Sequence, residues 1–154
     1  MITMTGAAGS IGGEVAYQLA HLGVRRLVVL ACAETPLHDL ELGLRKAFPD
    51  KNIAFVLSDV RSRARMKAVF EHYRPEFVFH AAAYKHVPMV EANPCEGVMT
   101  NIWGTVNTAN HAVRYGAEKF VMISTDKAIN PTNVMGASKR IAELCVQGFN
   151  ADGS

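Results

Sequence analysis

Three glycines at intervals of three residues directly follow a short apolar segment at the start of the chain. Gly6, Gly9 and Gly12 come after the apolar residues 1–4, where a strand would give way to a helix. In such a turn the first glycine permits a sharp bend, the second lets backbone N–H groups approach a pyrophosphate, and the third lets the helix lie close to its strand. The helix N-terminus adds free N–H donors and a partial positive charge. The motif therefore predicts a dinucleotide-binding turn, although a glycine triplet alone can simply mark a turn.

The residues after the glycines support the interpretation as a dinucleotide-binding turn. Ile11, Val15, Leu19 and Leu22 follow with the apolar spacing of a helix, and Gly23 is a typical residue for ending it. A strand, a glycine-rich turn and a helix in this order are the context that a nucleotide-binding turn requires.

Five short apolar segments recur along the chain and are rich in β-branched or aromatic residues. They are too short for helices, and their continuous apolar character suits strands covered on both faces of a parallel sheet. Segments with helical apolar spacing lie between them. This alternation predicts an α/β, Rossmann-like, doubly wound parallel sheet of about five strands. The expected strands are residues 2–4, 27–30, 53–57, 77–79 and 120–123.

The composition is that of a globular protein, with 154 residues of which 49% are apolar and 19% charged, and we expect residues 1–154 to form one domain. The net charge of +2 does not indicate a nucleic-acid or anionic-membrane partner. No run of eighteen apolar residues and no secretory leader is recognisable. The three widely spaced cysteines suit reduced thiols. These features predict a cytoplasmic protein without a structural metal.

Polar or small residues follow the third and fourth expected strands. Asp59 is placed either to accept a hydrogen bond from an adenine amino group or to cap the helix before Ser62. The small residues 81–83 would let a flat ligand lie close to the backbone. His80 and His86 could be metal ligands, but no third ligand has suitable spacing, which favours ordinary hydrogen-bonded histidines.

A hydroxyl, a carboxylate and an ammonium group follow the fifth expected strand. Thr125, Asp126 and Lys127 would lie at the carboxyl edge of the sheet, where doubly wound folds bind ligands. Their proximity would tune the carboxylate and the amine for acid–base chemistry, whereas the alternative is a solvated, salt-bridging turn. Two other residues have open interpretations. Asn101 either organises the site or lies on the surface, and Lys139 either contacts a cofactor ribose or is an exposed helix lysine.

Together these segments resemble the extended short-chain dehydrogenase/reductases. The strings that carry the resemblance are Thr-Gly-x-x-Gly-Ser-Ile-Gly at residues 5–12, His-Ala-Ala-Ala-Tyr-Lys-His-Val-Pro at residues 80–88 and Ser-Thr-Asp-Lys-Ala at residues 124–128. Within the NAD-dependent epimerase/dehydratase superfamily, the chain is most similar to the polysaccharide-biosynthesis branch of inverting UDP-N-acetylglucosamine 4,6-dehydratases. The resemblance covers nearly the whole chain, which corresponds to the N-terminal half of such enzymes.

The resemblance implies a reaction and a role for each site residue. In the family, a nicotinamide cofactor takes hydride from sugar carbon 4, the carbon 5 proton and the carbon 6 hydroxyl are lost, and hydride returns to carbon 6. Thr125 would orient the sugar hydroxyl, with Asp126 as the acid and Lys127 as the base, while Asn101 would support the site. The residues implied in cofactor binding are Gly6, Ala8, Gly9, Ser10, Ile11, Gly12, Asp59, Val60, Ala81, Ala82, Ala83, Lys85 and Lys139.

The chain departs from the family pattern in three ways. Met135 occupies the position four residues before Lys139 where short-chain enzymes usually have tyrosine, so another group must exchange the proton. Residues 30–34 lack the usual ribose-binding aspartate, although Glu34 is close by, and contain no arginine for a 2′-phosphate; we therefore expect NAD(H) to be favoured over NADP(H). The substrate-binding second half of the family's enzymes is also absent.

Three functions are consistent with these features. The first is an NAD(P)-dependent oxidoreductase that transfers hydride between nicotinamide and a small polar carbonyl or hydroxyl compound. The second is the full nucleotide-sugar dehydratase reaction, in an oligomer or a longer parent chain, and the third is a cofactor-binding module without turnover. The helical segments 98–113 and 134–149 match those that pair between subunits in the family, which predicts a homodimer.

Overall fold

The structure of the protein, a computed structural model, describes residues 1–151. Its centre is a five-stranded sheet in which every adjacent pair of strands is parallel. The strand order is β3-β2-β1-β4-β5. The chain adds β2 and β3 on one side of β1 and then returns to add β4 and β5 on the other side, which confirms the predicted doubly wound fold. The strands are β1 (Ile2–Thr5), β2 (Leu27–Ala31), β3 (Ile53–Leu57), β4 (Phe77–His80) and β5 (Lys119–Met122).

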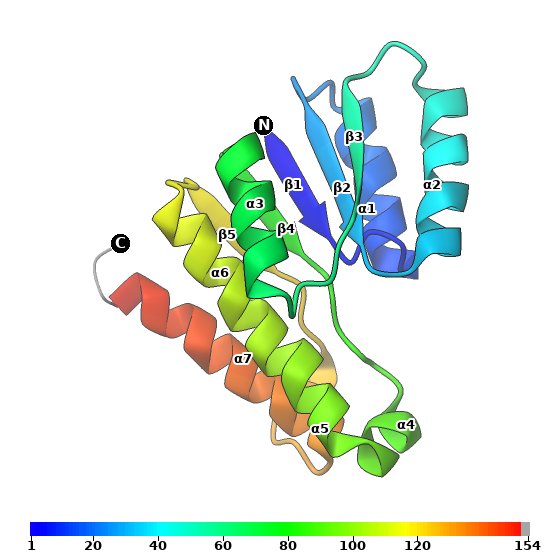
Figure 1. The fold of residues 1–154 in the computed structure, drawn as a ribbon. Coiled ribbons are helices and arrows are strands. Elements are labelled where there is room, and N and C mark those ends of the chain that lie inside the picture. The colour runs from blue at the N-terminus through cyan, green and yellow to red at the C-terminus, as the bar shows by residue number, and fades with distance from the viewer. Residues whose placement is uncertain (152–154) are drawn as a thin grey trace.

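Helices connect the strands and cover both faces of the sheet. Figure 1 shows α1 and α2 on one side and α3, α6 and α7 on the other. The α-helices are α1 (Ser10–His21), α2 (Glu34–Ala47), α3 (Arg63–Tyr73), α4 (Val87–Ala92), α5 (Pro94–Gly97), α6 (Gly104–Arg114) and α7 (Val134–Ala151). A π-helix, η1 (Val98–Trp103), runs directly into α6, and a 3₁₀ turn, η2 (Asp126–Ala128), precedes α7.

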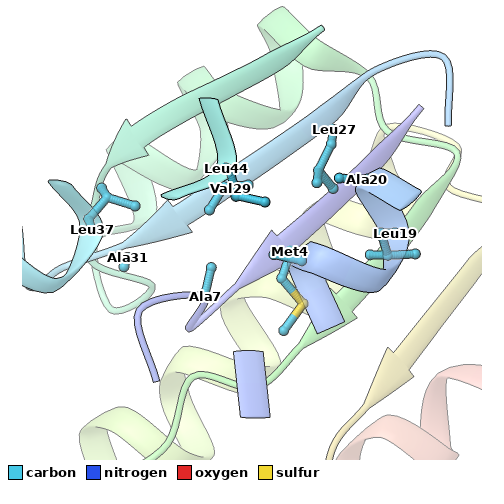
Figure 2. Close-up of a cluster of buried hydrophobic side chains, with 10 residues drawn as sticks. Met4, Ala7, Leu19, Ala20, Leu27, Val29, Ala31, Leu37 and Leu44 are labelled. Atoms are coloured by element: carbon cyan, nitrogen blue, oxygen red, sulfur yellow. The ribbon is translucent and has the colours of Figure 1, made fainter. Parts of the chain in front are cut away.

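Each face of the sheet has its own hydrophobic core. In the first core, side chains of β1 and β2 pack against α1 and α2, as Figure 2 shows for Met4, Leu27 and Leu44. In the second core, Leu30 and Val78 pack with residues of α3 and α6. Because successive strand residues point to opposite faces, β2 contributes to both cores and all five of its residues are buried. This two-sided burial explains the continuous apolar segments in the sequence.

Two of the expected helix boundaries can be compared directly with the structure. Gly23, with φ +74°, follows the end of α1 in the left-handed conformation that the sequence predicted for a helix stop. The alternative in which Asp59 caps α3 is wrong, because Ser62 is the N-cap and its side chain accepts a hydrogen bond from the Arg65 N–H. The carboxylate of Asp59 bonds to Arg61 instead.

β5 forms one edge of the sheet. Among the described residues it pairs only with β4. A groove of about 780 Å³ runs beside it between α6 and α7, with apolar residues such as Phe120, Met122 and Phe149 in its lining. No helix among residues 1–151 is both long enough and apolar enough to cross a membrane.

Candidate functional site

The glycine turn is held by contacts that exclude larger side chains at two of its three glycines. Gly6 has φ +68°, and a Cβ atom there would overlap the backbone of Ala82 in the loop after β4. A Cβ atom at Gly12 would overlap the carbonyl oxygen of Gly6. Gly9 differs, because its φ is −80° and a Cβ atom would lie 3.4 Å from the Gly6 oxygen. The fold therefore requires Gly6 and Gly12, whereas the expected role of Gly9 beside a pyrophosphate concerns the ligand.

The first turn of α1 offers backbone donors at the same place. Gly9 is the N-cap of α1 and has no side chain to bond to the N–H groups of the first turn. The first backbone bond of the helix is formed by the Gly13 N–H with the Gly9 oxygen, at 2.8 Å. The N–H groups of Ser10, Ile11 and Gly12 in this first turn are available to an anion, whereas the Gly9 N–H donates to the Gly6 oxygen at 3.1 Å.

Two cavities meet at this turn and form one cleft along the carboxyl edge of the sheet. The first, of about 280 Å³, extends from the glycine turn toward Asp59 and the end of β2. The second, of about 420 Å³, extends toward the end of β5 and the start of α7. Gly6, Gly9 and Tyr84 contribute to both cavities. The crevice lies where the strand order reverses, the usual ligand site of open parallel sheets.

The structure brings all the residues that the sequence assigned to cofactor binding into the lining of this cleft. Those in the first cavity are Gly6, Ala8, Gly9, Asp59, Val60, Ala81, Ala82 and Ala83. Those in the second are Gly6, Gly9, Ser10, Ile11, Gly12, Ala81, Ala83, Lys85 and Lys139. At the end of β2, Cys32 and Ala33 line the first cavity, whereas Glu34, considered as a substitute for the usual aspartate, begins α2 and is not part of the lining.

Asp59 is fixed in the first cavity by its neighbour Arg61. Its carboxylate accepts hydrogen bonds from the Arg61 backbone N–H and from Nε, both at 2.8 Å. The hydrogen bond to the guanidinium holds the pKa of Asp59 below its usual range, so the group is ionised at neutral pH. Arg61 also pairs with Glu96 at 2.8 Å, and Asn107 donates to the Val60 carbonyl at 2.7 Å. These contacts fix the acceptor that the sequence predicted for adenine.

His80 is a buried histidine at the end of β4, and the structure favours the hydrogen-bonded interpretation over a metal ligand. Its Nδ1 lies 2.7 Å from the Thr5 hydroxyl, and its Nε2 lies 2.9 Å from the Thr105 hydroxyl. Burial, together with the positive charge of Lys139, lowers the pKa of His80 to about 3, so the ring is neutral. Residues 1–151 contain no group of three His, Cys, Asp or Glu residues arranged to hold a metal ion.

Asn101 is fully buried, so the interpretation as a surface asparagine is wrong. Its Oδ1 accepts from the Tyr84 N–H at 2.8 Å, and its Nδ2 donates to the Tyr84 carbonyl at 3.0 Å. The same Nδ2 lies 2.9 Å from the Ser138 hydroxyl on α7. Asn101 therefore ties the loop after β4 to η1 and α7, two segments that are distant in the sequence.

Lys139 lies in the second cavity and is only 5% exposed, so the alternative of an exposed helix lysine is also wrong. Its Nζ donates a hydrogen bond to the Ile123 carbonyl at 2.7 Å. Burial lowers the pKa of Lys139 to about 8, and the nearby Glu143 carboxylate opposes this shift. Met135, four residues earlier on the same helix, is buried and lines the same cavity. A lysine of lowered pKa and a thioether therefore lie together at this end of the cleft.

The segment after β5 combines features of both interpretations made from the sequence. Thr125 and Lys127 line the second cavity, but Asp126 is not part of that lining and its side chain is 83% exposed. Lys127 Nζ lies 3.4 Å from the Asp126 carboxylate, which also accepts a hydrogen bond from the Thr125 hydroxyl at 2.9 Å. Thr125 and Lys127 lower the pKa of Asp126. The segment is a solvated, salt-bridging turn that also borders the cleft.

Sequence reasoning missed Glu143. It lies one turn beyond Lys139 on α7, and its carboxylate accepts a hydrogen bond from the Ser124 hydroxyl. The hydrogen bond from Ser124 and the charge of Arg140 lower the pKa of Glu143. The spacing of four residues from Lys139 was the one signal in the sequence, since residues four apart share a helix face.

Comparison with known proteins identifies the family. Residues 2–154 match the family described as polysaccharide biosynthesis protein. The chain belongs to this family. The finding confirms the resemblance inferred from the three sequence strings.

Relatives within the family, and a solved structure with the same fold, are all longer proteins. The chain is 44% identical to the capsular polysaccharide biosynthesis protein CapD of Staphylococcus aureus over 99% of its own length and 26% of that protein. It is 34% identical to the inverting UDP-N-acetylglucosamine 4,6-dehydratase of Campylobacter jejuni over 99% of its length and 45% of that protein. The UDP-glucose 4-epimerase of Thermus thermophilus in complex with NAD superposes with a TM-score of 0.83 at 26% identity, over 98% of this chain and 51% of the other. The chain thus spans about half the length of these proteins or less.

Proposed function

We propose that the cleft binds NAD(H) and that the chain forms the coenzyme-binding part of a nucleotide-sugar 4,6-dehydratase of polysaccharide biosynthesis. The observation that carries the proposal is the continuous cleft that joins Asp59, the glycine turn and Lys139 along the carboxyl edge of the sheet. The named activity of the Campylobacter jejuni relative and the NAD bound to the Thermus thermophilus epimerase support it.

The two ends of the cleft suit the two ends of a dinucleotide. The ionised Asp59 carboxylate is an acceptor for an adenine amino group, and the N–H groups at the start of α1 suit the pyrophosphate. Lys139 is fixed by the Ile123 carbonyl and can donate to a ribose hydroxyl at the other end. The cavity residues at the end of β2, Cys32 and Ala33, carry no charge for a 2′-phosphate. Arg61 lines the same cavity but is paired with Asp59 and Glu96, and this arrangement favours NAD(H) over NADP(H).

The residues after β5 border the part of the cleft where the sugar would react. A bound nicotinamide coenzyme supplies a hydride acceptor and donor. In the proposal, Thr125 orients the sugar hydroxyl, Asp126 is the acid for the departing water and Lys127 is the base at carbon 5. Asp126 lies exposed beside the cleft with a lowered pKa, and a sugar that covers it would raise that pKa by removing water, as the acid role requires.

The experiment titrates the protein with NADH and NADPH by calorimetry, then assays UDP-N-acetylglucosamine and a panel of small carbonyl compounds. Tighter binding of NADH than of NADPH supports the coenzyme assignment. Turnover of small carbonyls alone would favour the second candidate, an oxidoreductase of small compounds, which Thr125 and Lys127 in the lining of the second cavity make chemically accessible. Absence of binding by both coenzymes would overturn the proposal.

We further propose a homodimer and a cytoplasmic location. Large apolar side chains are exposed on the helices expected at the subunit interface, with Trp103 on η1 and Ile141 and Leu144 on α7 as examples. Burial of such residues against a second copy would remove apolar surface from water. The free thiols of Cys32, Cys95 and Cys145 fit a reducing compartment.

A further inference from the structure

Four polar groups form a continuous chain of hydrogen bonds beneath the cleft. The Thr5 hydroxyl lies 2.7 Å from His80 Nδ1, and His80 Nε2 lies 2.9 Å from the Thr105 hydroxyl. The Thr105 hydroxyl in turn lies 2.7 Å from the carbonyl oxygen of Asn101. Thr5, His80, Thr105 and Asn101 are all buried. Bulk water is therefore not available to replace any of these hydrogen bonds. The donor and acceptor of each bond are set by the neighbouring bond.

The last bond of the chain determines the direction of all the others. A carbonyl oxygen only accepts, so the single hydroxyl hydrogen of Thr105 must point to Asn101. Thr105 then has no hydrogen for His80, and its oxygen must accept from Nε2–H. Because the ring is neutral, Nδ1 carries no proton and accepts from the Thr5 hydroxyl. His80 is thus the Nε2–H tautomer, and every donor points from Thr5 toward Asn101.

The two ends of this hydrogen-bond chain, Thr5 and Asn101, lie next to the segments that line the cleft. Thr5 directly precedes Gly6, and His80 directly precedes the loop of Ala81–Ala83. Asn101, at the other end, holds the backbone of Tyr84 through two hydrogen bonds and contacts Ser138, the neighbour of Lys139. The hydrogen-bond chain therefore connects the glycine turn, the loop after β4 and α7.

We propose that His80 is a positioning residue, which in its Nε2–H form locks the glycine turn, the loop after β4 and η1 into the arrangement that receives the coenzyme. This inference rests on the proposed function. If these hydrogen bonds are lost, the free energy of ordering the segments must be supplied when the coenzyme binds, and the affinity for the coenzyme falls. His80 itself is buried beneath the site and acts through Thr5 and Thr105.

Two threonines on α6 provide a matched test. Thr105 and Thr108 are both fully buried, and each donates to the carbonyl four residues earlier at 2.7 Å. Only Thr105 also contacts His80. We expect Thr105→Val to weaken NADH binding roughly three- to tenfold, the range of one net hydrogen bond, while Thr108→Val leaves it unchanged. Thr105→Ser, which keeps the hydroxyl, should restore the wild-type affinity.

A second measurement does not depend on any variant. Long-range ¹H–¹⁵N correlation on the wild-type protein distinguishes a protonated Nε2 from a protonated Nδ1. We expect His80 to appear as the Nε2–H tautomer and not to titrate between pH 5 and 8.

Three results would overturn the inference. They are a His80 protonated on Nδ1, equal losses of affinity in the Thr105→Val and Thr108→Val proteins, and a Thr105→Ser protein as weak as Thr105→Val. If the wild-type protein binds neither NADH nor NAD⁺, the proposed function fails and the positioning role fails with it. If the wild type binds and the valine variants do not differ, the positioning role alone is wrong.

Discussion

The Ser124 hydroxyl donates a hydrogen bond to the carboxylate of Glu143, and this contact joins the end of β5 to α7 directly beside Lys139. Burial lowers the pKa of Lys139 and the negative charge of Glu143 partly offsets this, so that the pKa is about 8. Glu143 therefore affects the cleft in two ways, by holding the segment that leads into Thr125 and by favouring the charged form of the lysine.

We expect Glu143→Gln to lower the pKa of Lys139 further below about 8, because the stabilising carboxylate charge is removed while the burial remains. NMR titration of the ¹³C-methylated lysine would measure the shift. Glu41→Gln is the control, since Glu41 also pairs with a residue four positions away, Arg45, but on α2. An unchanged Lys139 pKa in Glu143→Gln would contradict the assigned coupling.

Lys139→Met should stabilise the protein at neutral pH, by up to about 3 kcal/mol, because it removes a buried ammonium group of lowered pKa. Between about pH 8 and pH 10.5 the unfolded chain binds a proton that the folded protein has released, so the free energy of unfolding of the wild type rises with pH over this window. The difference in free energy of unfolding between the methionine variant and the wild type should therefore decrease over the same pH range. Urea unfolding at pH 7 and pH 10.5 measures both effects, and the variant should also lose affinity for NADH.

Substitutions at the glycine turn should separate folding from binding. Gly6→Ala should destabilise the protein strongly, since its φ is +68° and the new Cβ atom would overlap Ala82. Gly9→Val should fold, because its backbone is extended and the nearest atom to a Cβ would lie 3.4 Å away, but it should bind NADH at least tenfold more weakly. Thermal unfolding and calorimetry on the two variants test this.

The control for the glycine substitutions is Gly148→Ala on α7. No atom lies within 4 Å of the Cβ position at Gly148, so alanine should stabilise the helix by about 0.5–1 kcal/mol without affecting NADH binding. Normal binding by the Gly9→Val protein would show that the turn does not approach the pyrophosphate.

The proposed dimer predicts that charges at its apolar surface will separate the subunits. The double change Ile141→Glu and Leu144→Glu should convert a dimer to a monomer in light scattering, because both side chains are exposed in one subunit and would become buried in the pair. Leu42→Glu on α2 is the control, because Leu42 is also exposed but lies on the other side of the sheet. A wild-type protein that stays monomeric at all concentrations would contradict the prediction.

The sequence predicted the sheet well because each strand appears locally as a short, largely apolar segment. The residues of β2 are apolar without interruption because both of their faces are covered, and the observed strand is one residue longer than expected. The glycine turn was also predictable, since Gly6 and Gly12 are required by local backbone geometry.

The polar contacts beneath the cleft were harder to predict because their partners are far apart in the sequence. His80 bonds to Thr5, 75 residues earlier, and to Thr105, 25 residues later. Asn101 could not be distinguished from a surface residue until Tyr84 and Ser138 were placed around it. Glu143 was missed because its partner Ser124 lies 19 residues earlier, in the segment between β5 and η2, and only the fold brings the two together.

The wide turn of η1 sets the rotational phase of the helix that follows it. Asn101 lies within this π-helix, and Thr105, Asn107 and Thr108 follow on α6 with their polar side chains directed into the protein. One residue accounts for about 100° of rotation in an α-helix. Removing a single residue from η1 would therefore swing Thr105 away from His80 and Asn107 away from Val60 at once. A change in the length of residues 98–105 should consequently be tolerated far less well than a substitution at an exposed position within them, such as Val98 or Met99.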